Sequence, residues 1–154
     1  MLYPWGDDDN QSTDPAMNFT NPAFDGKRGV HGKGYREFIE ADDATWFATV
    51  GDAVRDSIAA VRGRSYTVQQ GILLYPTSAT VHDYAYSRHL VQAADRKVMG
   101  FTIETGREFQ PPWAEAEQII EEVQAGLVTL IRNAMRAAES LLTERASAQA
   151  PSGG

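Results

Sequence analysis

VMGFTIETGREFQPP, residues 98–112, is the stretch on which the prediction of the fold depends. It begins with a short apolar run rich in β-branched and aromatic residues, which predicts a buried strand from Val98 to Glu104. The strand ends on the carboxylate of Glu104, which is costly to bury without a partner. In open α/β sheets, ligands and catalytic groups lie at the carboxyl ends of strands. Glu104 is therefore a candidate catalytic residue, and the alternative is a surface acid that begins an ordinary loop.

Helical spacing of apolar residues predicts two long helices, one before this stretch and one after it. The first spans Asp42–Arg62, with two aspartates in its first turn and Arg62-Gly63 at its end. The second spans about Trp113 to Glu144, and its apolar residues form one stripe that we expect to pack on a core. A short helix is expected over Val81–Leu90, and Ser65–Gln70 is a candidate short strand.

Composition limits the classes of function. The chain has 154 residues, which fits one domain or part of one. Its net charge of -7 argues against nucleic-acid or anionic-membrane partners, which need clustered Lys and Arg. There is no cysteine, so disulfides and thiolate chemistry are excluded. No apolar run has the length of a bilayer span, and the start lacks the order of a signal peptide, so we expect a soluble, untargeted chain.

Two segments are expected to lack regular structure. Residues 6–40 are rich in Gly, Pro and polar residues and predict a long loop. Their acidic run Asp7–Asp9 lacks the ligand spacing of an EF-hand, which favours a solvated charge run over a calcium site. Residues 146–154 predict a disordered tail.

Several short motifs occur together in one order along the chain. They are LYPWG at residues 2–6, SY at 65–66, LLYPTSATVHDYAY at 73–86, FTIETG at 101–106, and then the long C-terminal helix. In this order the chain, from about Leu2 to Met135, resembles the C-terminal part of zinc metallocarboxypeptidases of the carboxypeptidase A/B type. In that family, the LYP-aromatic-G segment directly follows the strand that bears the last zinc-binding histidine.

The resemblance assigns roles to three residues. Glu104 matches the general base, which takes a proton from a zinc-bound water whose pKa the metal lowers to about 7. Tyr75 matches the mobile tyrosine that closes on the terminal carboxylate of the substrate, and the alternative is a loop aromatic packed on the core. His82 falls at the base of the pocket for the C-terminal side chain. It either hydrogen-bonds a polar or aromatic side chain there or caps the local helix.

Three features depart from the family pattern. His82 is neither the apolar residue nor the acid that family members carry at this position, so the substrate preference stays open. The segment from Tyr86 to Glu104 contains an added polar stretch, which suggests a bacterial branch of the family. No H-x-x-E motif occurs, and His31, His82 and His89 are poor substitutes for the three ligands of a catalytic zinc. We therefore expect zinc in the complete family enzyme and none on this chain alone.

The resemblance implies an α/β fold, with residues 1–145 forming the C-terminal portion of a mixed sheet flanked by helices. Two to four strands are expected here. The implied activity is metallopeptidase release of C-terminal residues, with a peptide C-terminus as substrate and the missing N-terminal half as a possible partner. Exposed strand edges and apolar helix faces also predict self-association. The alternatives are a non-catalytic peptide-binding or interaction module, the partner half of a split enzyme, and a truncated reading frame without function. Family members of this type are often secreted.

Overall fold

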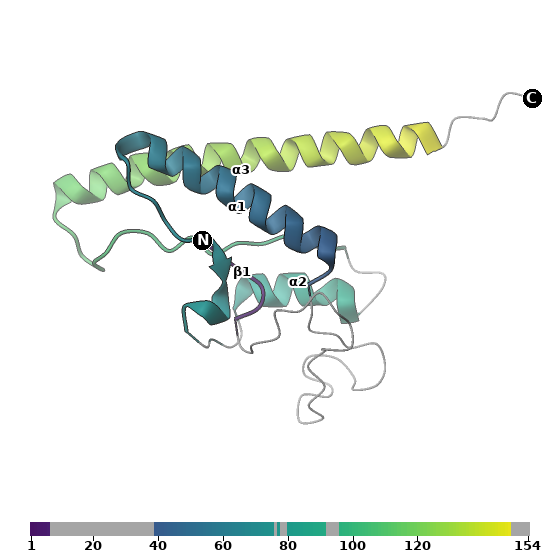
Figure 1. Cartoon of the computed structure of the whole chain (residues 1–154), viewed down its shortest axis with the longest axis horizontal. Helices are drawn as coiled ribbons and strands as arrows, with labels where there is room; N and C mark the ends of the chain where they lie inside the picture. The colour runs from purple at the N-terminus through teal and green to yellow at the C-terminus, as the bar shows by residue number, and fades with distance from the viewer. Residues whose placement is uncertain (7–38, 76, 78–79, 92–95, 149–154) are drawn as a thin grey trace, which may run out of the picture. The chain divides into compact units, whose positions relative to one another are not determined.

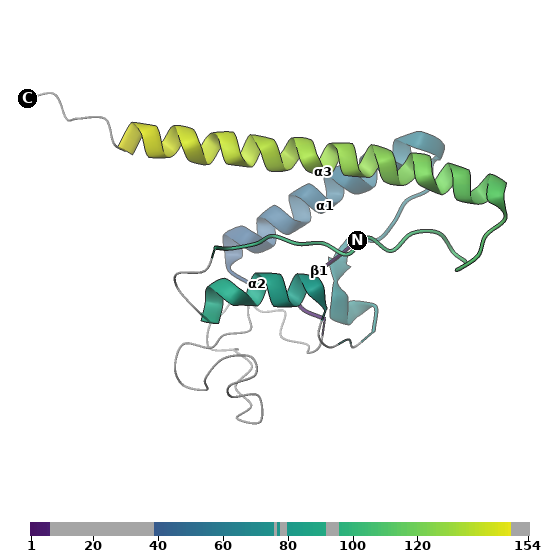
Figure 2. The same cartoon turned by 180° about the vertical axis from the view of Figure 1, so that it is seen from behind.

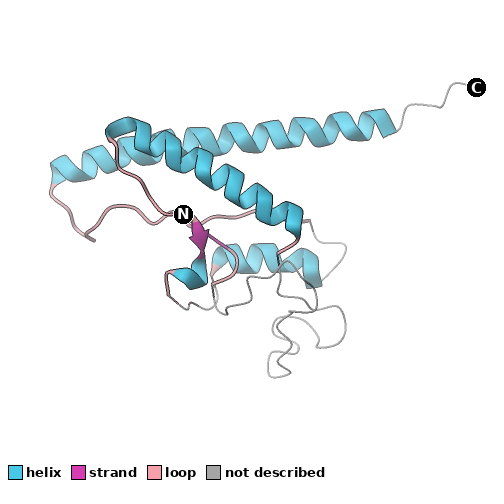
Figure 3. Ribbon diagram, in the orientation of Figure 1, coloured by secondary structure: helices cyan, strands magenta, loops and turns pink. Residues whose placement is uncertain are grey.

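The structure is a computed structural model that describes residues 1–6, 39–75, 77, 80–91 and 96–148 (Figure 1). Most of these residues are helical, and the strands are very short (Figure 3). The chain divides into two compact units. Unit 1 comprises Met1–Gly51 and Tyr66–Thr105, and unit 2 comprises Asp52–Ser65 and Gly106–Gly154.

The three predicted helices are confirmed. Helix α1 spans Ala41–Arg62, α2 spans Val81–Val91 and α3 spans Trp113–Ala148 (Figure 2). The acidic first turn and basic last turn of α1 complement the helix dipole. Gly63 follows α1 with a φ of 79°, a left-handed conformation that glycine adopts without steric cost. None of the described helices has the length and apolar character that crossing a membrane requires.

A small parallel sheet lies in unit 1. Strand β1, Leu2–Tyr3, pairs with β2, Gln69–Gln70, so that Leu2 is opposite Gln69. Of the predicted strand at 65–70, only its last two residues are in the sheet. The 3-10 helix η3, Gly71–Leu73, follows β2 directly. With helices and a parallel sheet together, the described residues are compatible with the α/β class.

The stretch from Val98 to Glu104 does not form the buried strand that its sequence predicts. The backbone of Thr102 pairs with Leu2 on the edge of β1 opposite β2, through two antiparallel hydrogen bonds of 2.8 and 2.9 Å. The remaining residues of the stretch extend no ladder, and Val98 is 47% exposed. Since a strand needs a paired neighbour along its length, the two-residue β1 limits this pairing to one bridge.

An aromatic cluster forms the core of unit 1. The buried side chains are Trp5, Ile39, Phe47 and Tyr86, which come from the N-terminal segment, the start of α1 and the middle of α2. Tyr86 packs edge-on against both Trp5 and Phe47, with ring centroids 5.5 and 5.8 Å apart. The packing of these large rings joins segments that are far apart in the sequence.

In unit 2, α3 packs against the second half of α1. A side chain at Gly126 would lie 2.9 Å from Ile58, so the absence of one lets the two helices approach closely. Next to this contact, the fully buried carboxylate of Glu122 pairs with the guanidinium groups of Arg62 and Arg64. Arg62 also pairs with Glu115, which lies about two turns before Glu122 on α3, at 2.8 Å.

The expectation that the whole apolar stripe of α3 packs on a core is wrong for part of the helix. The large exposed members of the stripe are Ile120, Leu127, Ile131 and Leu141. The packed face, which carries Glu122 and Gly126, lies on the opposite side of the helix from Ile131. The predicted loop falls outside the described residues from 7 to 38. The predicted disordered tail is wrong for residues 146–148, which continue the last turn of α3, and residues 149–154 lie outside the described residues.

Candidate functional site

Glu104 lies two residues beyond the bridge between Thr102 and Leu2. Because that bridge is antiparallel, the chain that leaves Thr102 toward Glu104 runs toward the amino-terminal end of β1. The Glu104 carboxylate is exposed, so it carries no cost of burial, contrary to the expectation of an acid at the end of a buried strand. Burial lowers the pKa of the Met1 amino group, and the negative charge of Glu104 acts in the opposite direction. Glu104 is therefore an accessible carboxylate at the Met1 end of β1.

Tyr75 follows η3 and is 56% exposed. Since β2 is parallel to β1, the chain that leaves Gln70 toward Tyr75 passes the carboxyl-terminal end of β1. The pairing of the sheet therefore sends Tyr75 and Glu104 to opposite ends of β1. Tyr75 also belongs to an exposed apolar run, in which Leu73 and Leu74 are 57% and 48% exposed.

His82 is buried, with 4% of its surface exposed. Its Nδ1 lies 2.8 Å from the hydroxyl oxygen of Thr102, and its Nε2 lies 3.4 Å from a carboxylate oxygen of Asp83. Burial lowers the pKa of His82, and the charge of Asp83 raises it in part. At neutral pH the imidazole is therefore uncharged, and it joins α2 to the segment that carries Glu104.

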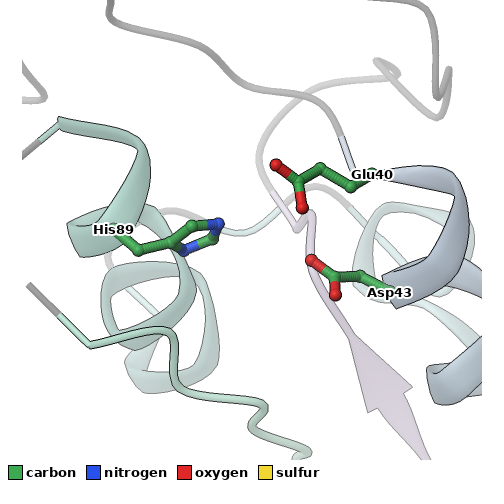
Figure 4. Close-up of side chains that lie close together, drawn as sticks. All are labelled: Glu40, Asp43 and His89. Atoms are coloured by element: carbon green, nitrogen blue, oxygen red, sulfur yellow. The ribbon is translucent and has the colours of Figure 1, made fainter. Parts of the chain in front are cut away.

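A second group of polar residues lies at the aromatic core of unit 1. Glu40 and Asp43, at the start of α1, lie close to His89 of α2, so that one ligand atom of each falls within 4.8 Å of the others (Figure 4). The Asp43 carboxylate accepts a 2.7 Å hydrogen bond from the Tyr86 hydroxyl. Burial raises the pKa of Tyr86, and the bond to Asp43 raises it further, so the phenol stays protonated and donates.

Lys97 determines what this carboxylate pair can bind. Its ammonium lies 2.6 Å from a Glu40 oxygen and 2.8 Å from an Asp43 oxygen. Burial acts to lower the pKa of Lys97, but hydrogen bonds and charges of Asp43 and Glu40 together outweigh it and raise the pKa. The two carboxylates thus already hold a cation between them. A zinc ion needs ligand atoms about 2.0–2.2 Å away in the space the ammonium fills, so this group does not fit the metal.

No expectation for this group follows from the sequence, although part of its pattern is visible there. Glu40 and Asp43 are three residues apart at the start of a helix, and Tyr86 and His89 are three apart on α2, so each pair shares one helix face. In the sequence, Asp43 indicates only a favourable charge at the start of the helix. The sequence does not indicate that α1 and α2 meet at these faces.

The described residues hold three predicted site residues in distinct settings. Glu104 is exposed at the Met1 end of β1, Tyr75 is exposed beyond the other end, and His82 is buried behind Thr102. Only His82 and the segment of Glu104 are brought into contact. Comparisons of the chain with protein-family models, with curated proteins and with solved structures found no match.

Proposed function

We propose that this chain supplies the base-carrying part of a zinc carboxypeptidase-type site, in which Glu104 is the general base and the metal ligands lie on a separate segment. The order of the motifs supports the family. In addition, the fold class that the resemblance implies is compatible with the helices and parallel sheet of the structure.

The position of Glu104 relative to β1 is the observation that carries the proposal. In the family, the segment that matches β1 directly follows the strand with the last zinc ligand. The antiparallel bridge of Thr102 sends Glu104 toward that same end of β1. A metal-binding residue on a strand that leads into Met1 would therefore lie near an exposed carboxylate that can take a proton.

The proposed step is hydrolysis of the last peptide bond. Zinc, when bound, supplies a water of lowered pKa. Glu104 would accept a proton from the water that attacks the carbonyl carbon. It would then return this proton to the nitrogen of the leaving residue as the C–N bond breaks. His82 contacts the Thr102 hydroxyl and thereby positions the segment that carries Glu104. Tyr75 would reach the substrate carboxylate only by turning back toward the Met1 end of β1.

The coding sequence upstream of Met1 tests the proposal directly. We expect an H-x-x-E motif and a later histidine there, in one of the three reading frames. The chain by itself should bind no stoichiometric zinc and should not hydrolyse a blocked dipeptide such as benzoyl-glycyl-phenylalanine. Stoichiometric zinc and hydrolysis by the chain alone would contradict the assignment of the ligands to another segment.

The exposed apolar run favours a second candidate, a non-catalytic module that binds peptide C-termini. Leu73, Leu74 and Tyr75 present adjacent apolar side chains to solvent, and such patches mark interaction sites. Titration of the chain with a blocked dipeptide, followed by NMR, separates the two candidates. Binding at residues 73–75 without zinc, together with an upstream sequence that has no metal motif, would favour the module.

A further inference from the structure

The exposed side of α3 carries a regular apolar stripe. Its large members are between 42% and 66% exposed, and they are Ile120, Leu127, Ile131, Met135 and Leu142. Together with Gln124 and Ala138 they recur at intervals of 4, 3, 4, 4, 3 and 4 residues, which is an eleven-residue repeat. That repeat corresponds to about 3.67 residues per turn, so the stripe runs almost straight along the helix. A straight stripe of this kind suits a second straight helix.

Between Trp113 and Glu144, the charges that border the stripe lie along one flank. Near its start are Glu117 and Glu121, and farther along are Arg132, Arg136 and Glu139. All five side chains are exposed. The two glutamates near the start are spaced i, i+4, and so are the two arginines, so each pair places like charges side by side on its own helix, which is unfavourable. The flank thus begins with two acids and continues with two arginines, and Glu139 follows three residues after Arg136.

The positions of these charges match in an antiparallel pair of identical helices. If the two-fold axis passes between Gly126 and Leu127, residue numbers that face each other add up to about 253. Glu121 then faces Arg132 of the second copy, and Glu117 faces Arg136. Because the pairing is two-fold, both matches occur twice, and the like-charge repulsion within each helix is compensated. Leu127 meets its own copy at the axis.

A parallel pair lacks this match. Parallel helices bring one flank of the stripe against the opposite flank of the partner. Between Trp113 and Glu144, the opposite flank of α3 is uncharged and includes Ala116, Val123, Leu130, Ala134 and Leu141. The two glutamates and two arginines would then face apolar residues and keep their like-charged neighbours.

We propose that the exposed stripe of α3 is a homodimer surface on which a second copy of this chain packs in antiparallel, two-fold fashion. This inference concerns α3 in unit 2 and does not depend on the proposed peptidase site in unit 1. It gives the self-association expected from the sequence a specific surface and symmetry.

Charge exchange on the full-length chain tests the pairing. The variants are Glu117→Arg with Glu121→Arg, which leaves the flank with four arginines and the single acid Glu139, and Arg132→Glu with Arg136→Glu, which makes it wholly acidic. Sedimentation equilibrium should show a dimer for the unchanged chain, and a dissociation constant raised at least about tenfold for either variant alone. An equimolar mixture of the two variants should recover the dimer. Circular dichroism checks that the helices remain folded, which we expect because the four positions are exposed.

Cross-linking tests the direction of the helices, since the chain contains no cysteine. Leu127→Cys should form a disulfide-linked dimer on oxidation. In the antiparallel pair, Ala138→Cys should not, because positions 138 of the two copies would be about 35 Å apart at 1.5 Å of rise per residue. A monomer at all concentrations would overturn the proposal and leave the stripe to another partner. A dimer that survives both charge variants, or that cross-links at both cysteines, would overturn the antiparallel pairing.

Discussion

Replacing Tyr86 by phenylalanine tests whether the polar group at the aromatic core stabilises unit 1. The change keeps the ring that packs against Trp5 and removes the hydroxyl. That hydroxyl donates a 2.7 Å hydrogen bond to the Asp43 carboxylate and accepts a longer one of 3.4 Å from the Glu40 backbone. A hydrogen bond to a charged group contributes about 1.5–3 kcal/mol, whereas the longer bond adds little. Since Asp43 keeps its contact with Lys97, we expect a loss of about 1.5–3 kcal/mol in the free energy of unfolding.

Urea unfolding followed by tryptophan fluorescence measures this change, because Trp5 lies 5.5 Å from the Tyr86 ring. Tyr84→Phe is the matched control, since Tyr84 is on the same helix and is 65% exposed. The control should change the unfolding free energy by less than about 0.5 kcal/mol. Equal midpoints for the two variants, or a larger effect of Tyr84→Phe, would refute the contribution of the bond between Tyr86 and Asp43.

Two further predictions concern unit 2. Gly126→Val should lower the free energy of unfolding by about 1–3 kcal/mol, because its Cβ would lie 2.9 Å from Ile58; an unchanged melting temperature would contradict this contact. Hydrogen bonds from Arg62 lower the pKa of Glu115 from 4.5 to about 2, and a depressed pKa stabilises the fold above the unfolded value. The stability from this pair should therefore be present above pH 4.5 and be lost as the pH falls toward 2. Glu115→Gln should flatten the loss over that range in acid unfolding, and an equally steep loss would count against the pair.

The helices were predictable because their signals are local. α1 has an apolar face, acidic residues in its first turn and Gly63 after its end, and all of these lie within the segment itself. α2 has an acidic residue in its first turn and basic residues in its last turn, and α3 has apolar residues at helical spacing. What the periodicity of α3 does not reveal is which part of its stripe is covered, because that depends on where α1 packs. The close contact at Gly126 determines this, and it leaves Ile131 exposed.

The strand at 98–104 and the polar group of unit 1 were harder to predict because both depend on distant partners. A β-branched run predicts a strand only if a neighbour pairs along its length, and β1 offers a single bridge, to Thr102. Lys97, in a segment whose sequence predicts a polar connection, pairs with Glu40 and Asp43, which lie more than fifty residues away in the sequence. No pattern within either segment indicates this contact. For the candidate site, the order of the motifs indicates Glu104. Its position at the Met1 end of β1 depends on the bridge between Thr102 and Leu2, which the sequence does not indicate.

The kinetics of Glu104→Gln test the central claim most directly, in a polypeptide extended to include the metal-binding residues that the proposal expects upstream. With zinc and benzoyl-glycyl-phenylalanine, the change should lower kcat by about 100-fold to 10,000-fold, the range for loss of a general base. Glu108→Gln, an exposed acid four residues farther along, is the control and should leave kcat unchanged. Zinc content should be equal in both variants, which separates loss of the base from loss of the metal. Full activity of Glu104→Gln would contradict the account.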